Sequence, residues 1–509
     1  MEDDNYIEDP TETSANILYN FIVNEDKGKS EHKKGKSKKT AKTFLGKESP
    51  TPIPNLHLLD IKIALKYEED KLYLKNDNIY HYLRRGNCLT YNTKTGQKGI
   101  ARIGLIKFFD YRNNFTSYHS EEKRVLEKVK QSKLVLSVYL TEKANGENFQ
   151  VSWNTTYNCW IIGSKNVTIA CRDIKDIDFY ENVENFKRKN FTPEIKDFMT
   201  DKIMLDKRRY EYVLEFGRTW FEILNKIFKT KEELDEFKKV IGNHTFIGEN
   251  VGDKTHQHIK IYQDKDISFY GIVNHLTYDT EICLPLSKSF EIFKKFGLSS
   301  VPFEKSENFQ NFSELKNFLD KKYDEILLKS IKESGEGNVI YIVENGGDND
   351  DNNKNGENER IISVAKLKTF EYRFYRKIRE KIKIILERYR KHPKNLSLND
   401  LKVSLRNESE ELAENFKEEL GFEKYIKFSD FVFDYVIKYD NQKNYFDVFA
   451  EFIHMLKFSF NKIEENKDNT ETDNKIEDNY KEKYDEEYRK IKEDLDKKFV
   501  GIEKLNINK

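Results

Sequence analysis

The sequence predicts an α+β fold, in which antiparallel sheets with flanking helices precede an all-helical C-terminal domain. Between about residues 57 and 390, short stretches rich in β-branched and aromatic residues alternate with stretches of helical periodicity. After Pro393 no further proline occurs, and the only glycines are Gly421 and Gly501, so a second β-rich domain would lack turn residues. The alternation in the first region is typical of α+β domains.

Residues 1–55 predict a disordered N-terminal arm that is first acidic and then basic. Residues 26–47 form a lysine run whose Gly, Lys and Ser residues lack the spacing of a phosphate-binding loop. We expect this run to aid nuclear import or to attract RNA, and "SPTPIP" at 49–54 is typical of a linker.

The region 56–392 is predicted to be one α+β domain. Seven stretches combine β-branched or aromatic residues with flanking turn residues and are predicted strands: VLSVYL (135–140), NFQVSW (148–153), CWIIGS (159–164), YEYVLEFG (210–217), HTFIGENV (244–251), ISFYGIV (267–273) and NVIYIV (338–343). Two stretches show helical periodicity: SKSFEIFKKFG (287–297) and FSELKNFLDKKYDEILLKSI (312–331). The polar segment 345–359 cannot bury an apolar face and is predicted to be a disordered hairpin insertion.

The remaining chain is predicted to form a C-terminal helical domain at 393–462 and a charged tail at 463–509, either a solvated helix or disordered. The segment 366–394 holds 12 Lys and Arg residues but only three acidic residues, a balance suited to contact with an RNA backbone. A coiled-coil-like surface would have a similar composition.

Bulk composition narrows the class of protein without naming a partner. Lys plus Arg and Asp plus Glu both number 89, so the net charge indicates no particular ligand. The four cysteines show no CxxC spacing, which disfavours a disulfide framework or a zinc ribbon and fits a reducing compartment. No apolar run approaches the roughly 20 residues that cross a bilayer, and the N-terminus lacks the apolar core of a secretory signal. We expect a nuclear or cytoplasmic protein that binds no membrane.

Lys143 lies between a predicted strand and an Asn-Gly turn, within "YLTEKANGENFQVSW" at 139–153. Alone, a lysine three residues before Gly146 is weak evidence, because lysine-rich chains contain such pairs by chance. Its importance depends on polar residues later in the chain: Ser164-Lys165 at a strand end, Glu249 at the end of an apolar strand, and Glu336 opening another strand. In isolation, each of these is an ordinary strand-end polar residue.

The stretch "VAKLKT" at 364–369 alternates apolar residues with Lys366 and Lys368. Because side chains of a strand alternate between its faces, both ammonium groups point to the same side. Two lysines on one face require negative charge opposite them, and a triphosphate supplies it.

The order Lys143, Glu249, Glu336-Gly337 and Lys366-x-Lys368 resembles motifs I, III, IV and V of the covalent nucleotidyltransferases. These enzymes are the RNA ligases, DNA ligases and mRNA capping enzymes. The resemblance implies a nucleotidyltransferase domain of antiparallel sheets, with Lys143 as the nucleophile that becomes lysyl-AMP.

The chemistry of such an enzyme explains the residue types. A lysine that attacks the α-phosphate of ATP must be deprotonated, so we expect neighbouring cations and a metal to lower the pKa of Lys143. The pyrophosphate leaving group requires positive charge from lysines and Mg²⁺ (or Mn²⁺). Mg²⁺ keeps most of its waters, so Glu249 and Glu336 would suffice as metal ligands.

Upstream stretches narrow the resemblance. "RRGNCLTYN" at 84–92 and "IARIGLIKFFDYRNNF" at 100–115 resemble the signature of the phage tRNA-repair RNA ligase and fungal tRNA ligase. This match implies that Arg85 and Lys107 clamp the leaving phosphates, with Asp110 where Asn is usual. Four later stretches favour the fungal enzyme: "ENVGDKTHQHIKIYQDKDISFYGIVNH", "AKLKTFEYRFYRKIREK", "RYRKHPKN" and "FVFDYVI". The resemblance covers roughly residues 80–460.

The resemblance implies further roles. Asn145 and Gly146 would shape the turn beside the nucleotide, and Ser164 and Lys165 would contact the nucleotide or the RNA end. Glu249 would contact the ribose or the metal, Glu336 would order metal-bound water, and Lys366 and Lys368 would contact the α-phosphate. Of the adjacent Phe269 and Tyr270, at most one can stack on the adenine, because neighbouring strand residues face opposite sides.

The expected function is that of an ATP-dependent RNA ligase joining 5′-phosphate and 3′-OH ends, with tRNA halves as substrate. Two departures from the fungal enzyme stand out: Glu147 occupies a position where a small residue is usual, and neither the kinase nor the cyclic phosphodiesterase of that enzyme is visible. We therefore expect separate end-healing enzymes as partners. The rivals are an mRNA capping guanylyltransferase, a DNA ligase and a catalytically inactive RNA-binding relative. The first two normally carry a β-barrel after motif V, which the Gly- and Pro-poor tail disfavours.

Overall fold

The fold is taken from a computed structural model that describes eight stretches, 9–31, 44–63, 69–112, 119–182, 207–252, 264–329, 335–346 and 359–374, with isolated residues up to 410. The chain divides into two compact units, Met1–Glu380 with Glu411–Phe422, and Lys381–Glu410 with Glu423–Lys509. Every described strand belongs to the first unit.

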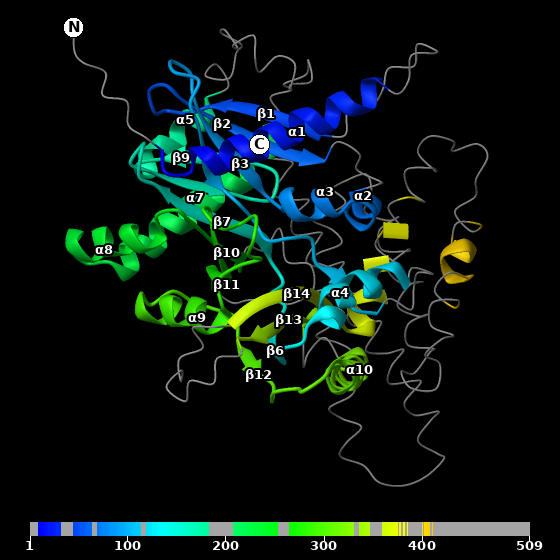
Figure 1. Ribbon diagram of the computed structural model, residues 1–509. Helices are drawn as coiled ribbons and strands as arrows, with labels where there is room; N and C mark the ends of the chain where they lie inside the picture. The colour runs from blue at the N-terminus through cyan, green and yellow to red at the C-terminus, as the bar shows by residue number, and fades with distance from the viewer. Residues whose placement is uncertain are drawn as a thin grey trace, which may run out of the picture. The chain divides into compact units, whose positions relative to one another are not determined.

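The first unit begins with a four-stranded antiparallel sheet in the order β1-β2-β3-β4, across which helix α1 lies (Figure 1). These elements are α1 (Glu12–Glu31), β1 (Phe44–Pro50), β2 (Leu56–Ile63), β3 (Asn87–Asn92) and β4 (Lys98–Arg102). Ala15, Leu18 and Ile22 are fully buried at helical spacing. The prediction of a disordered arm over 1–55 was therefore wrong for α1 and β1. Sparse apolar residues suffice here, because the sheet covers one helix face and β2 pairs the backbone of β1.

A second sheet has five antiparallel strands in the order β11-β10-β7-β8-β9. The strands are β7 (Glu147–Asn154), β8 (Cys159–Gly163), β9 (Thr168–Cys171), β10 (His244–Val251) and β11 (Asp266–Asn274). They confirm four of the predicted strands. The alternation of apolar and polar residues that predicted them is the pattern of strands with two different faces.

A third sheet has the order β12-β6-β13-β14-β5 and is antiparallel except for the parallel pair β14–β5. Its strands are β5 (Phe109–Asp110), β6 (Val135–Glu142), β12 (Phe303–Lys305), β13 (Gly337–Asn345) and β14 (Glu359–Lys368). Strands β13 and β14 pair antiparallel, and Asn345 lies opposite Glu359 at the end of the pair. This pairing confirms the predicted hairpin. Residues 347–358 between the two strands lie outside the described residues.

Helix α7 (Lys207–Ile227) corrects the prediction of a strand at YEYVLEFG, 210–217. Val213, Phe216 and Trp220 are buried at helical spacing and pack on the second sheet, with the Trp220 ring centroid 5.4 Å from that of Trp160. The β-branched and aromatic residues that suggested a strand thus form the apolar stripe of a helix. Local propensity gives way to this packing.

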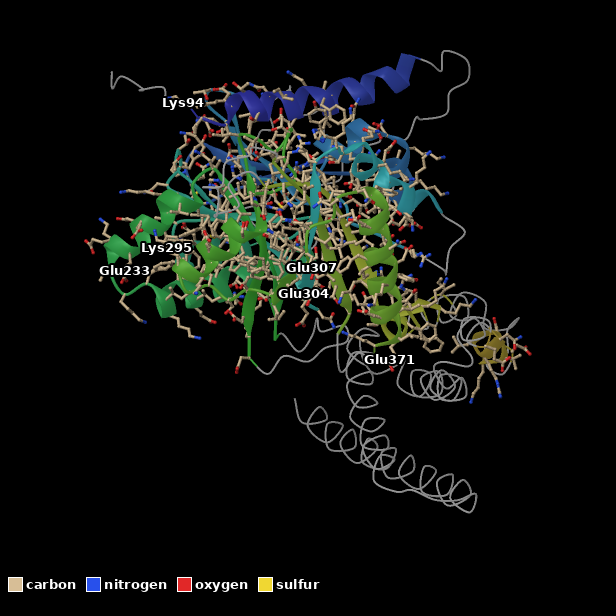
Figure 2. All side chains as sticks on the ribbon, turned by 60° about the horizontal axis from the view of Figure 1, so that its bottom comes forward. Lys94, Glu233, Lys295, Glu304, Glu307 and Glu371 are labelled. Atoms are coloured by element: carbon tan, nitrogen blue, oxygen red, sulfur yellow. The ribbon has the colours of Figure 1, made fainter. Side chains whose placement is uncertain are left out.

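The other helices flank the sheets, and the two predicted ones are confirmed at α9 and α10. They are α2 (Glu69–Lys75), α3 (Asp77–Tyr82), α4 (His119–Gln131), α5 (Ile177–Glu181), α8 (Lys231–Ile241), α9 (Leu286–Lys295) and α10 (Phe312–Leu328), with a 3₁₀ turn at Ile174–Asp176. Charged side chains such as Glu233 on α8 and Lys295 on α9 lie at the edge of the molecule (Figure 2). The flanking helices complete the mixed α/β architecture with antiparallel sheets.

In the second unit the structure describes helical residues at 402–407 and a few isolated positions. The rest of the predicted C-terminal domain and the charged tail, and most of the basic segment after Phe374, lie outside the described residues. Among the helices that are described, none is long and apolar enough to cross a membrane.

Candidate active site

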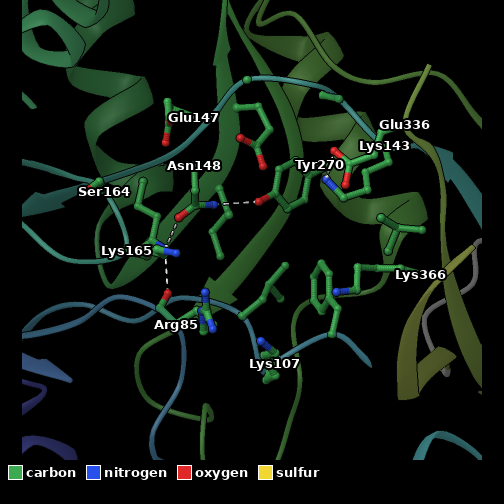
Figure 3. Close-up of a pocket in the computed structure, with 18 of the residues that line it drawn as sticks. Arg85, Lys107, Lys143, Glu147, Asn148, Ser164, Lys165, Tyr270, Glu336 and Lys366 are labelled. Atoms are coloured by element: carbon green, nitrogen blue, oxygen red, sulfur yellow. Dashed lines mark hydrogen bonds and ion pairs between the residues drawn. The ribbon is translucent and has the colours of Figure 1, made fainter. Parts of the chain in front are cut away.

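A cavity of about 880 Å³ lies where the second and third sheets both contribute lining residues (Figure 3). Apart from Asn145, all the site residues that the sequence predicted line this cavity: Arg85, Lys107, Lys143, Gly146, Ser164, Lys165, Glu249, Glu336, Lys366 and Lys368. These residues are up to 283 positions apart in the chain (Arg85 to Lys368) and come from seven strands or loops. The fold therefore brings together what the sequence presented only as an order of motifs.

Lys143 lies in the short connection between β6 of the third sheet and β7 of the second. Its backbone N–H donates to the carbonyl oxygen of Gly337, 2.9 Å away, at the start of β13. Its Nζ lies 2.8 Å from Oε2 of Glu336, which is only 4 % exposed. The backbone and the side chain of Lys143 are thus both hydrogen-bonded to residues at the start of β13.

Gly337 is required by this arrangement. Its φ of +129° is unfavourable for residues with a Cβ, and a Cβ there would clash with the carbonyl oxygen of Leu367 on β14. The neighbouring Glu336 is held through its own carbonyl oxygen, which accepts from Thr369 N–H at 3.3 Å. The Glu-Gly pair therefore places a buried carboxylate opposite the lysine.

The electrostatics of Lys143 contradict the expectation of a lowered pKa. Burial disfavours its charge, but the carboxylates of Glu336 and Glu249 outweigh burial and raise the pKa above the usual lysine value. The expectation that neighbouring cations lower this pKa was wrong, because the nearest charged neighbours of Lys143 are acidic. In this state of the protein Lys143 is an ammonium group.

Glu249 is the less well compensated of the two carboxylates. Burial, together with the nearby Glu147 and Glu336, raises its pKa to about 8, against the opposing attraction of Lys143. A buried carboxylate that is short of positive charge is a suitable ligand for a divalent cation. Within the described stretches no group of three or more His, Cys, Asp or Glu side chains is arranged to hold a metal. Two carboxylates nevertheless match the needs of Mg²⁺, which retains most of its waters, so Glu249 and Glu336 fit this ion.

Cations gather in another part of the cavity. Lys366 and Lys368 extend from β14, and Lys107 and Arg85 come from the loops after β4 and α3 (Figure 3 labels three of them). Burial and then the neighbouring Lys366 lower the pKa of Lys368 to about 7, against Asp110 and Glu336. Burial, Arg85 and Lys366 lower the pKa of Lys107 to about 8. Mutual repulsion of this kind indicates a site built for an anion.

Each of three cations also has a carboxylate partner that the sequence did not reveal. Arg85 Nη1 lies 2.6 Å from Glu69 Oε1, and Lys107 Nζ lies 2.5 Å from Asp70 Oδ1, both on α2. Lys368 Nζ lies 3.8 Å from Asp110 Oδ1 on β5. No sequence signal marks Glu69 and Asp70, because they belong to an ordinary acidic helix start.

The backbone around Arg85 is fixed by polar side chains. Gln150 Nε2 donates to the carbonyl oxygen of Arg85 at 2.7 Å, and Arg102 Nη1 donates to that of Gly86 at 2.8 Å. Gly86 has a φ of +102°, and a Cβ there would collide with both side chains. The Arg-Gly pair is thereby held against β7, with the Arg85 side chain in the cavity.

The remaining predicted residues divide into lining and supporting positions. Ser164 and Lys165 follow β8 and line the cavity, where burial and then Arg85 lower the pKa of Lys165. Asn145 is buried and lies outside the lining, so its place is in the turn itself. Gly146 does line the cavity, and a Cβ there would clash with the Asn250 carbonyl oxygen.

The choice between Phe269 and Tyr270 is settled by burial. Phe269 is fully buried in the aromatic core, whereas Tyr270 lines the cavity and accepts a hydrogen bond at Oη from Asn148 Nδ2, 2.8 Å away (Figure 3). Tyr270 is therefore the ring available to a base.

Tyr372 is a cavity residue that sequence reasoning missed. Its side chain is almost fully buried and forms a hydrogen bond with Glu336. It follows the Lys366-x-Lys368 strand by four residues, but the sequence does not distinguish it from the other aromatics around it. Its contact with Glu336 places it beside the carboxylate that faces Lys143.

Comparisons with known proteins find no matching family model and no matching curated protein. Solved structures that are similar include two forms of an archaeal ATP-dependent RNA ligase. Form 1 has a TM-score of 0.39 and 11% identity and covers 76% of this chain and 74% of that chain. Form 2 has a TM-score of 0.35 and 10% identity and covers 68% and 67%.

Another similar structure is a Naegleria gruberi RNA ligase with PPi, with a TM-score of 0.27 and 10% identity, covering 65% of this chain and 98% of that chain. These three structures are described as RNA ligases, and their TM-scores are below 0.5.

Proposed function

We propose that this protein is an ATP-dependent RNA ligase that joins a 5′-phosphate to a 3′-OH through lysyl-AMP and RNA-adenylate intermediates. One observation carries the proposal. A partly buried lysine, Lys143, faces two carboxylates in the same cavity in which Arg85, Lys107, Lys366 and Lys368 gather. A nucleophile, candidate ligands for a metal and a polyphosphate site are the three parts that nucleotidyl transfer to a lysine requires.

In the first step, Nζ of Lys143 would form a bond to the α-phosphorus of ATP while the bond from that phosphorus to the pyrophosphate oxygen breaks. The ammonium group must first lose a proton, and its two carboxylate neighbours oppose that loss. Mg²⁺ or Mn²⁺, bound by Glu249 and Glu336, would supply positive charge that offsets those carboxylates. Arg85, Lys107, Lys366 and Lys368 would hold the phosphates, and Tyr270 would face the base.

In the later steps, AMP would pass from Lys143 to the RNA 5′-phosphate, and a 3′-OH would then displace AMP to form the phosphodiester. We place the natural substrate among tRNA halves, on the resemblance of the motif order and the upstream signature to tRNA ligases. Separate kinase and phosphodiesterase enzymes would prepare the ends, and the site of action would be the nucleus or cytoplasm.

The test is incubation with α-³²P-labelled ATP or GTP and Mg²⁺, followed by a denaturing gel. We expect ATP to leave a label that survives denaturation and that disappears in Lys143→Ala. Lys133→Ala is the matched control, because Lys133 precedes the other end of β6 and is exposed. Labelling by GTP alone would instead indicate a capping guanylyltransferase, and no labelling by either nucleotide would leave an inactive RNA-binding relative.

Sealing assays separate RNA from DNA as the substrate. A nicked or single-stranded RNA with 5′-phosphate and 3′-OH ends should be joined, whereas the corresponding DNA should not. Lys143→Ala should fail on 5′-phosphate RNA yet retain sealing of pre-adenylated RNA, because Lys143 acts only in the first transfer. Equal sealing of DNA would point to a DNA ligase.

A further inference from the structure

Three cations proposed to hold phosphate are already paired with carboxylates, and the pairs differ in exposure. Asp110, opposite Lys368, has a side chain that is only 14 % exposed and lies in the third sheet. Glu69 and Asp70, opposite Arg85 and Lys107, are 35 % and 60 % exposed. The cations themselves are 24 % and 16 % exposed and line the cavity.

This difference decides which carboxylates can give way to a ligand. A carboxylate that is largely shielded from solvent cannot leave its cation without losing its partner while gaining little solvation. A partly exposed carboxylate can exchange its cation for water, because water replaces much of what the ion pair provided. Asp110 is therefore a permanent neighbour of the lysines, whereas Glu69 and Asp70 are exchangeable.

An incoming phosphate would need the same N–H donors that Glu69 and Asp70 now occupy. Arg85 Nη1 and Lys107 Nζ each lie within hydrogen-bond distance of a carboxylate oxygen, at 2.6 and 2.5 Å. The two carboxylates come from consecutive residues in the first turn of α2, and Asp70 lines the cavity. The pKa of Asp70 is held below its usual range, against burial, by Lys107, Lys366 and Arg85, so this carboxylate is ionised.

We propose that Glu69 and Asp70 are exchangeable counter-anions that compete with pyrophosphate for Arg85 and Lys107, and so weaken the hold on this product after lysyl-AMP has formed. The inference rests on the proposed function, in which Lys143 and ATP give lysyl-AMP and pyrophosphate. No bond is made or broken in the exchange: two carboxylates replace two phosphate groups on the same N–H donors. The pair also keeps the cations from repelling one another when no nucleotide is bound.

The test is titration calorimetry of the full chain with inorganic pyrophosphate, with and without Mg²⁺. Glu69→Gln and Asp70→Asn should each bind pyrophosphate about three- to tenfold more tightly than the unmodified protein. The double variant should gain more, and the gain should shrink as salt rises from 50 to 500 mM because the competing charges are screened. Asp77→Asn is the matched control. Asp77 begins α3, the helix after α2, and its exposed carboxylate pairs with Arg124 of α4 but does not line the cavity. The affinity of this variant should not change.

A second readout is pyrophosphate-driven reversal of the labelled lysyl-AMP, whose KM for pyrophosphate should fall by the same factor in Asp70→Asn. Unchanged or weaker pyrophosphate binding in both single variants would overturn the inference, as would the absence of pyrophosphate binding in every protein. The proposed function fails separately. If the substitutions tighten pyrophosphate binding but no labelled lysine ever forms, the role of Glu69 and Asp70 as counter-anions stands and the assignment as an RNA ligase falls.

Discussion

In one part of the cavity a cation lies among carboxylates, and in another a carboxylate lies among cations. Lys143 faces Glu336 and Glu249, which raise its pKa despite burial. Asp110 faces Lys366 and Lys368, which hold its pKa well below the usual range despite burial. Lys143 and Asp110 are each kept in the ionised form by the opposite charges of their neighbours.

The comparison teaches that the two regions keep their charge for different uses. Around Lys143 the surplus is negative, which suits a metal cation and keeps the amine of Lys143 protonated. Around Asp110 the surplus is positive, which suits a polyphosphate. Under the proposed function, one nucleotide with its metal would offset both surpluses together.

The largest effect is expected at the lysine. Glu336→Gln removes the charge 2.8 Å from Lys143 Nζ and one proposed metal ligand, so formation of lysyl-AMP should fall by at least about 100-fold. The measurement is the rate of covalent labelling by ATP under saturating Mg²⁺. Glu344→Gln, on the same strand but paired with Arg360 away from the cavity, should label at the normal rate. Equal losses in the two variants would mean that β13 as a whole, and not the charge at Glu336, is responsible.

A smaller effect, on the stability of the protein, is expected at Asp110, the carboxylate that lies among cations. Asp110→Asn leaves Lys366 and Lys368 without their buried counter-charge and should lower the free energy of unfolding by about 2–3 kcal/mol. The loss is limited because Lys368, with a pKa of about 7, can release its proton. Urea denaturation at pH 7 measures it. Asp320→Asn, a half-buried ion-pair partner of Lys316 outside the cavity, should change stability by less than about 1 kcal/mol.

The smallest effect is the pH dependence of stability that His275 causes. It has to be known before the variants of either charged region are compared at acidic pH. His275 is buried, and its Nε2 shares a hydrogen bond of 2.8 Å with the Thr245 hydroxyl, which accepts from Ile103 N–H. Burial lowers its pKa from the usual 6.5 to about 3. Because the unfolded chain binds this proton below pH 6.5 and the folded protein does not, stability should fall as pH drops from 6.5, by about 1.4 kcal/mol at pH 5.5.

Urea denaturation of the unmodified protein and of His275→Gln at pH 7.5 and 5.5 measures this contribution. The glutamine amide can donate or accept in the same hydrogen bond but does not titrate, so the stability of the variant should depend less on pH by that amount. An identical pH dependence in the two proteins would show that His275 is not the group responsible.

Much of the sheet architecture could be predicted from the sequence, since strands such as β6, β10 and β13 have clear β-branched and aromatic runs between turn residues. Helix α7 was mistaken for a strand because the same residue types also suit a buried helix stripe, and only packing against Trp160 decides between them. At α1 and β1 the local sequence signals are weak. The two elements form because α1 packs on β4 and β1 pairs with β2.

In the site, the order of motifs and the upstream resemblance pointed to the charged residues Arg85, Lys107, Lys143, Glu249, Glu336, Lys366 and Lys368, which line one cavity. Most of the other lining residues carried no signal in the sequence. The sign of the pKa shift at Lys143 could not be predicted, since it depends on which charges lie within a few ångströms. The same holds for Glu69 and Asp70, whose partners Arg85 and Lys107 are 16 and 37 residues further along the chain. Such contacts exist only in the folded molecule.

The short connection that carries Lys143 joins one sheet to another, and this has a consequence for how the protein matures. Glu249 belongs to β10 of the second sheet and Glu336 immediately precedes β13 of the third. A partly folded chain with only one sheet formed holds at most one of the two carboxylates near the lysine. The complete charge set around Lys143 therefore exists only after both sheets have assembled.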